Sequence, residues 1–65
     1  MTTEIDIWRT AHFHLKRYGD DAARDAGERA NAWAQKGDTA SEALWRRVAV
    51  AIEELRLSKK PSALN

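Results

Sequence analysis

Two histidines, His12 and His14, are the side chains whose type and spacing come nearest to a metal site. A His-x-His pair can chelate an ion from a β-strand, where both imidazoles lie on one face. On an α-helix, side chains two residues apart diverge by about 200°. The chain has no cysteine, and neither Glu4 nor Asp6 completes an i, i+4 pair of ligands with an imidazole. We therefore predict no metal site and interpret both histidines as partly exposed surface residues.

The carboxylates and hydroxyls give equally little support for catalysis. Glu53 and Glu54 are adjacent, so on a helix their side chains point about 100° apart and do not form an acid–base pair. The serines have no histidine in a recognisable partnership; they are Ser41, Ser58 and Ser62. A chain of 65 residues also leaves little room for a substrate pocket. We predict that the protein is not an enzyme and uses no cofactor and no small-molecule substrate.

Length and composition indicate one small domain. A chain of 65 residues is near the size at which a single core is only marginally sufficient, and 43% hydrophobic with 32% charged residues is typical of a globular protein. The formal net charge of +1 provides no overall attraction to nucleic acid or to an anionic membrane. No apolar run approaches the ~20 residues of a membrane span, and no basic segment followed by an apolar one opens the chain. We expect a cytoplasmic protein.

Three stretches show the apolar periodicity of amphipathic helices. The most regular runs from Thr39 to Leu57, and the others run from about Glu4 to Tyr18 and from Asp21 to Gln35. Their core-facing positions are Ile7, Trp8, Ala11, Leu15 and Tyr18 in the first stretch, Ala22, Ala23, Ala26, Ala30, Trp33 and Ala34 in the second, and Leu44, Val48, Ala51 and Leu55 in the third. Each helix contributes one tryptophan, and we expect the three rings to dominate the core.

Two Gly-Asp pairs separate these helices. Gly19 and Gly37 accept the positive φ that often ends a helix, and a following Asp or Thr can cap the next one. The candidate caps are Asp20 or Asp21 for the second helix and Asp38 or Thr39 for the third. Turns this short place consecutive helices as antiparallel neighbours, so we predict an all-α, up-down-up three-helix bundle over residues 3–57. Residues 58–65 lack periodicity and predict a flexible, disordered C-terminal tail.

Phe13, Ala49 and Val50 lie away from the core-facing stripes, and Ala43 and Leu57 continue the strip of Val50 along the third helix. The candidate surface residues are Phe13, Ala43, Val50 and Leu57. Two interpretations stay open, because these residues could face another helix inside the bundle or form a surface for a partner. The second interpretation makes them the candidate interaction surface. We therefore favour a non-catalytic protein-interaction or accessory module whose partner is another protein or a second copy of the chain, as in a homodimer.

A nucleic-acid-binding accessory protein is the alternative function. Its candidate basic patch consists of Arg9, Lys16, Arg17, Arg46 and Arg47. Acidic residues are interleaved with these positions, and the net charge is nearly balanced. A helix-turn-helix register centred on Gly37 also fails, since it puts Lys36 and Asp38 at the usually apolar flanks. Nucleic-acid binding is thus the less favoured interpretation.

Four segments resemble a family of small uncharacterised alphaproteobacterial three-helix proteins. The similarity rests on an acidic and aromatic start at 4–9, two Gly-Asp turns at 18–22 and 37–38, and the segment 45–55 with its Ala-Ile-Glu-Glu-Leu close. These motifs are caps and core positions. The resemblance therefore implies a helical fold in a bacterial, cytoplasmic setting, and it carries no catalytic residue, cofactor or partner over to this chain.

Overall fold

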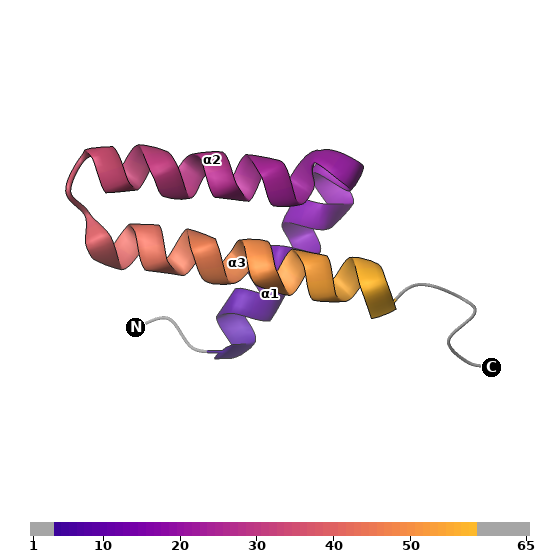
Figure 1. Ribbon diagram of the computed structural model, residues 1–65. Helices are drawn as coiled ribbons and strands as arrows, with labels where there is room; N and C mark the ends of the chain where they lie inside the picture. Colours follow the sequence, from indigo (N-terminus) through magenta and orange to yellow (C-terminus); the bar gives the residue numbers. More distant parts are fainter. Residues whose placement is uncertain (1–3, 59–65) are drawn as a thin grey trace.

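The computed structural model describes residues 4–58, which are helical except for the turn at 36–38 (Figure 1). The elements are α1 (Glu4–Tyr18), the 3₁₀ turn η1 (Gly19–Asp21), α2 (Ala22–Gln35) and α3 (Thr39–Ser58). The prediction of an all-α chain is confirmed for this part. Ser58 ends α3 and does not begin the tail, and the rest of the tail, 59–65, lies outside the described residues, as does the start of the predicted domain at residue 3.

Gly19 ends α1 and bends the chain into a 3₁₀ turn. Its φ of +60° lies in the left-handed region that glycine adopts freely, and the 3₁₀ turn leads directly into α2. The predicted aspartate cap of α2 is not formed, because Asp21 precedes the helix without a side-chain capping bond. Its carboxylate pairs instead with Arg24, at 2.9 Å.

The turn between α2 and α3 contains both predicted signals. Gly37, with a φ of +80°, donates its backbone N–H to the carbonyl of Ala34, and Asp38 donates its backbone N–H to the carbonyl of Trp33. Both N···O distances are 3.0 Å, and the pair of bonds is a Schellman ending of α2. The Asp38 carboxylate then accepts the backbone N–H of Ser41 at 3.0 Å. Asp38 is therefore the cap of α3, as one of the two predicted alternatives had it.

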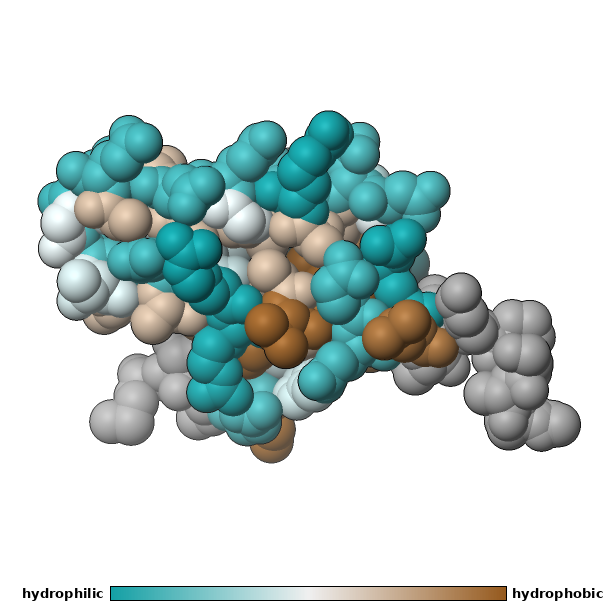
Figure 2. All heavy atoms as spheres, in the orientation of Figure 1, coloured by the Kyte–Doolittle hydropathy of each residue, from teal (hydrophilic) through white to brown (hydrophobic). Residues whose placement is uncertain are grey.

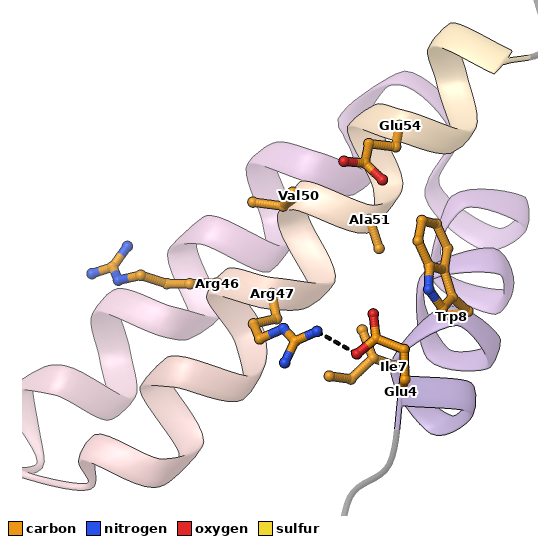
Figure 3. A pocket seen from close by; sticks show the side chains of 8 residues that line it. All are labelled: Glu4, Ile7, Trp8, Arg46, Arg47, Val50, Ala51 and Glu54. Atoms are coloured by element: carbon orange, nitrogen blue, oxygen red, sulfur yellow. Dashed lines mark hydrogen bonds and ion pairs between the residues drawn. The ribbon is translucent and has the colours of Figure 1, made fainter.

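The three helices do not form the up-down-up bundle that we predicted. α2 and α3 lie side by side as an antiparallel hairpin, and α1 crosses this hairpin obliquely (Figures 1 and 3). α1 packs mainly on α3 and only slightly on α2. The connection between α1 and α2 is only η1, a three-residue turn in which Gly19 has a left-handed φ and changes the direction of the chain, so α2 does not fold back along α1.

The core consists of small side chains, and the tryptophans lie at its edge. Its fully buried members are Ala11, Ala22, Ala26, Ala30, Val48 and Ile52, with Ile7 and Ala51 nearly so. The prediction that three indole rings dominate the core is wrong, since Trp8, Trp33 and Trp45 are only partly buried. The alanines let the helix axes approach closely, which leaves the large rings outside. Of the three rings, that of Trp8 forms a wall of surface grooves.

Candidate interaction surface

Four of the apolar residues predicted off the core-facing stripes are exposed, whereas Ala49 is half-buried and packs against the core. Phe13 is 65% exposed, Val50 59% and Leu57 62%, and Ala43 is exposed as well. No other helix of the described chain covers them, which excludes the interpretation that they face another helix inside the bundle, and their role as a partner surface stays a prediction. Ile5, 68% exposed, belongs with them but was not predicted. Its distance of two residues from the buried Ile7 is the signal that could have revealed it, since that spacing turns a helical side chain about 200° away.

One groove lies between α1 and α3, and we name it the Val50 groove (Figure 3). It encloses about 290 Å³. Its residues are Glu4, Ile7, Trp8, Arg46, Arg47, Val50, Ala51 and Glu54. Trp8 faces Ala51 across it, and an ion pair between Glu4 and Arg47 joins the two helices at one end. This groove has apolar walls and carries charges of both signs.

A second groove lies on the other side of the same tryptophan, and we name it the Phe13 groove. It is a shallow, open depression of about 630 Å³ lined by Ile5, Trp8, Arg9, His12, Phe13, Lys16 and Leu55. All but one of these residues belong to α1, and Leu55 closes the groove from α3. Its lining contains basic side chains and no carboxylate. The Phe13 groove therefore combines apolar surface with positive charge.

The four predicted surface residues do not form one continuous strip. Phe13 and Val50 belong to the two grooves that share Trp8. Ala43 lies in a shallow depression near the start of α3, next to the Val50 groove through the shared residues Ile7 and Arg47. Leu57 is the second-to-last residue of α3. The α1–α3 side of the molecule thus carries a divided apolar surface.

The five basic residues of the alternative function are also divided. Arg46 pairs with Glu42 at 2.8 Å and donates to the side-chain oxygen of Asn31 at 3.2 Å. Arg47 pairs with Glu4. The other three belong to α1, where Arg9 and Lys16 line the Phe13 groove and Arg17 lies beside Lys16 and Phe13. Carboxylates bind the arginines of α3, so a single basic patch does not form.

His14 corrects the prediction of a surface histidine. It is only 7% exposed, and its Nε2 lies 2.7 Å from the Oδ2 of Asp25 on α2. The ring lies 4.5 Å from that of Tyr18 and 5.5 Å from that of Trp45, between centroids. The cause is its spacing: His14 follows the buried Ile7 by seven residues and Ala11 by three, which returns it to the core-facing side. His12, by contrast, is exposed as predicted.

One carboxylate oxygen of Asp25, Oδ2, contacts side chains of both α1 and α2. The same atom that contacts His14 accepts the Nε–H of Arg29 at 2.7 Å. The guanidinium of Arg29 also lies 5.2 Å from the Trp45 ring centroid and donates to the Tyr18 hydroxyl at 3.4 Å. The hydrogen bond from Arg29 lowers the pKa of Asp25 most strongly, burial opposes it, and His14 lowers the pKa further. Asp25 in turn raises the pKa of Arg29.

This polar cluster joins the helices and does not resemble a catalytic site. Neither His14 nor Asp25 lines the Val50 groove or the Phe13 groove. A histidine–carboxylate pair activates a nucleophile only when a substrate can reach that nucleophile. Within residues 4–58, no three His, Asp or Glu side chains converge to hold a metal ion. The physical role of this polar cluster is to give the buried His14 imidazole a hydrogen-bond partner where α1 meets α2.

Comparison with known proteins adds no relative: no protein-family model matches the chain, and no match was found among curated proteins or solved structures. The resemblance to small alphaproteobacterial proteins therefore stays a prediction. Over the described residues, none of the helices combines the length and the apolar character needed to cross a membrane.

Proposed function

We propose that the protein is a small non-catalytic interaction module that binds a protein partner through the α1–α3 side of the molecule. The observation that carries this proposal is the position of the exposed apolar side chains. Ile5, Phe13 and Val50 all line the two grooves beside Trp8. The visible outer face of α2 is mostly hydrophilic, whereas apolar atoms gather on the α1 and α3 side (Figure 2).

Physical reasoning supports a partner for this surface. Covering a large apolar side chain contributes about 1.5–3 kcal/mol relative to leaving it in water. The largest fully buried side chains of the core are only Val48 and Ile52. Five other large apolar side chains of the described chain stay exposed: Ile5, Phe13, Tyr18, Val50 and Leu57. A partner that covers Phe13 and Val50 gains this energy without any change of fold.

Affinity capture with matched variants tests the proposal. The wild-type chain, Phe13→Asp and Val50→Asp are each used to capture partners from cells of the source organism. We expect both variants to keep their helical circular dichroism and to lose a partner that the wild type retains. Ala32→Asp, on the exposed side of α2, is the control and should retain that partner. Equal recovery of every partner by all four chains would refute the proposal.

The nucleic-acid alternative has less support but makes a distinct prediction. Binding through Arg9, Lys16, Arg17, Arg46 and Arg47 requires the last two to leave the carboxylates that they contact. Such binding would weaken steeply as salt rises, because phosphate contacts release counterions. A titration with DNA and RNA at two salt concentrations distinguishes this function from protein binding. The bacterial and cytoplasmic setting stays a prediction.

A further inference from the structure

The Phe13 groove has a complement on the same chain. The groove presents Ile5 and Phe13 among three basic side chains, Arg9, His12 and Lys16. The outer face of α3 presents Val50, Glu53, Glu54 and Leu57, all exposed, and we name these four residues the acidic strip. Their spacing of three, four and seven residues places them on one side of a helix. The Phe13 groove is apolar with positive charge. The acidic strip is apolar with two carboxylates, of which Glu53 lies 3.5 Å from Arg56 and would exchange that partner in a contact with the groove.

We propose that the partner of this surface is a second copy of the chain, with the acidic strip of each copy seated in the Phe13 groove of the other. This inference rests on the proposed function and names its partner. Charge complementarity favours it, because Glu53 and Glu54 would meet Arg9 and Lys16. An amphipathic helix laid into an apolar groove is a common mode of protein recognition.

The position of the two surfaces permits a symmetric dimer. Trp8 lines both the Phe13 groove and the Val50 groove, and the latter contains Val50 and Glu54 of the acidic strip. The strip and the groove are therefore neighbours on one side of the molecule. A twofold axis between them lets each copy give its strip and receive the other's strip at once, as an isologous interface requires. A chain of 65 residues with a core of small side chains is also of the kind that oligomerisation commonly stabilises.

Charge reversal on each surface gives the test. The strip variant carries Glu53→Lys and Glu54→Lys, and the groove variant carries Arg9→Glu and Lys16→Glu. Either variant alone opposes like charges in both contacts of a homodimer. We expect each to raise the dimer dissociation constant by about 100-fold or more in sedimentation velocity. Glu28→Lys, an exposed reversal on α2, is the control and should leave the constant unchanged.

Mixing the two variants is the decisive measurement. In the mixed dimer, both contacts again join opposite charges, so we expect a heterodimer at concentrations where each variant alone is a monomer. Circular dichroism establishes that both variants are folded. A chain that carries all four reversals again pairs opposite charges in both contacts and should form a homodimer. This result would show that the reversals do not prevent folding. Failure to form the heterodimer with both variants folded would overturn this pairing of surfaces.

Other occupants of the groove have their own outcomes. If the wild type stays a monomer at every concentration, the homodimer is rejected. Binding of a helical peptide that alternates Leu and Glu at the spacing of the acidic strip, lost in the groove variant, would then leave the interaction module intact with another protein as partner. Binding only to vesicles of phosphatidylserine and phosphatidylcholine would overturn both proposals in favour of a membrane surface.

Discussion

The Nε2 of His14 lies 2.7 Å from the Oδ2 of Asp25, and this contact joins α1 to α2 across the bend at Gly19. His14 is nearly buried, whereas Asp25 stays partly exposed. The contact therefore satisfies an imidazole inside the fold, next to the rings of Tyr18 and Trp45. It adds a polar contact to the slight packing of α1 on α2, while α1 packs mainly on α3.

Replacing His14 should destabilise the fold. We expect His14→Ala to lower the free energy of unfolding by about 1–3 kcal/mol, because it removes both a buried ring and its hydrogen bond. Urea unfolding followed by tryptophan fluorescence measures this change. His12→Ala, at an exposed position of the same helix, should alter the value by no more than about 0.5 kcal/mol. Equal effects of the two substitutions would contradict the role assigned to His14.

Acid should weaken the fold through Asp25. Its pKa lies below the ordinary value of 3.8, chiefly because Arg29 donates a hydrogen bond to it. The unfolded chain therefore binds the proton more readily than the folded chain does. The stability from this group is present above about pH 5 and is lost as the pH falls through 3.8 to the lowered pKa of the folded state.

The variant Asp25→Asn tests this pH dependence. The asparagine cannot titrate. In this variant the curve of unfolding free energy against pH should therefore be flatter than that of the wild type from about pH 5 down to the lowest pH at which the protein folds. Urea titrations at several pH values provide the curve. Asp21→Asn, which changes an exposed carboxylate that pairs with Arg24, is the comparison. A slope as steep in Asp25→Asn as in the wild type would rule out this source.

Two glycines should respond to alanine in opposite directions. Gly19 has a φ of +60°, so Gly19→Ala should destabilise the protein by about 1–2 kcal/mol through backbone strain. Gly27 lies inside α2, and no atom lies within 4 Å of an added Cβ. Gly27→Ala should therefore stabilise by up to about 1 kcal/mol. Thermal unfolding of both variants measures the difference, and a stabilising Gly19→Ala would argue against the bend.

The cap of α3 can be tested in the same manner. Asp38→Ala removes the acceptor for the backbone N–H of Ser41 and should cost about 0.5–2 kcal/mol of stability. Thr39→Ala leaves this bond in place and should have the smaller effect. Chemical denaturation of the two variants compares them directly. A larger loss in Thr39→Ala would assign the cap to Thr39 instead.

The helices were predictable from the sequence, but their arrangement was not. Apolar periodicity and the two glycines locate α1, α2 and α3 to within a residue or so, because these signals are local. The crossing of α1 depends on how Gly19 and the residues after it continue as a 3₁₀ turn, and the same Gly-Asp letters can equally begin a loop. The marginal tryptophans follow from close packing around alanine, which depends on all three helices together.

The exposure of two residues of the candidate surface was predictable, but the shape of that surface was not. Phe13 and Val50 deviate from the core-facing stripes, and this local signal identified them as surface candidates. The division of the surface into two grooves beside Trp8 requires the position of α1 across α3. His14 was missed for a similar reason, since Asp25 lies eleven residues away and only the fold brings the two side chains together.

Sedimentation velocity of the wild type and Phe13→Asp over one concentration series tests the interaction surface most directly. A charged residue in the Phe13 groove removes about 1.5–3 kcal/mol of apolar burial per groove, and the symmetric dimer has two such grooves, so the dissociation constant should rise by about 100-fold to 10,000-fold. We predict that the wild-type chain, of 7.4 kDa, shifts toward twice that mass as its concentration rises, while Phe13→Asp stays a folded monomer over the same range. Dimers of equal stability in the two chains would contradict the assignment of this groove, and a wild type that stays a monomer over the whole range would reject the homodimer.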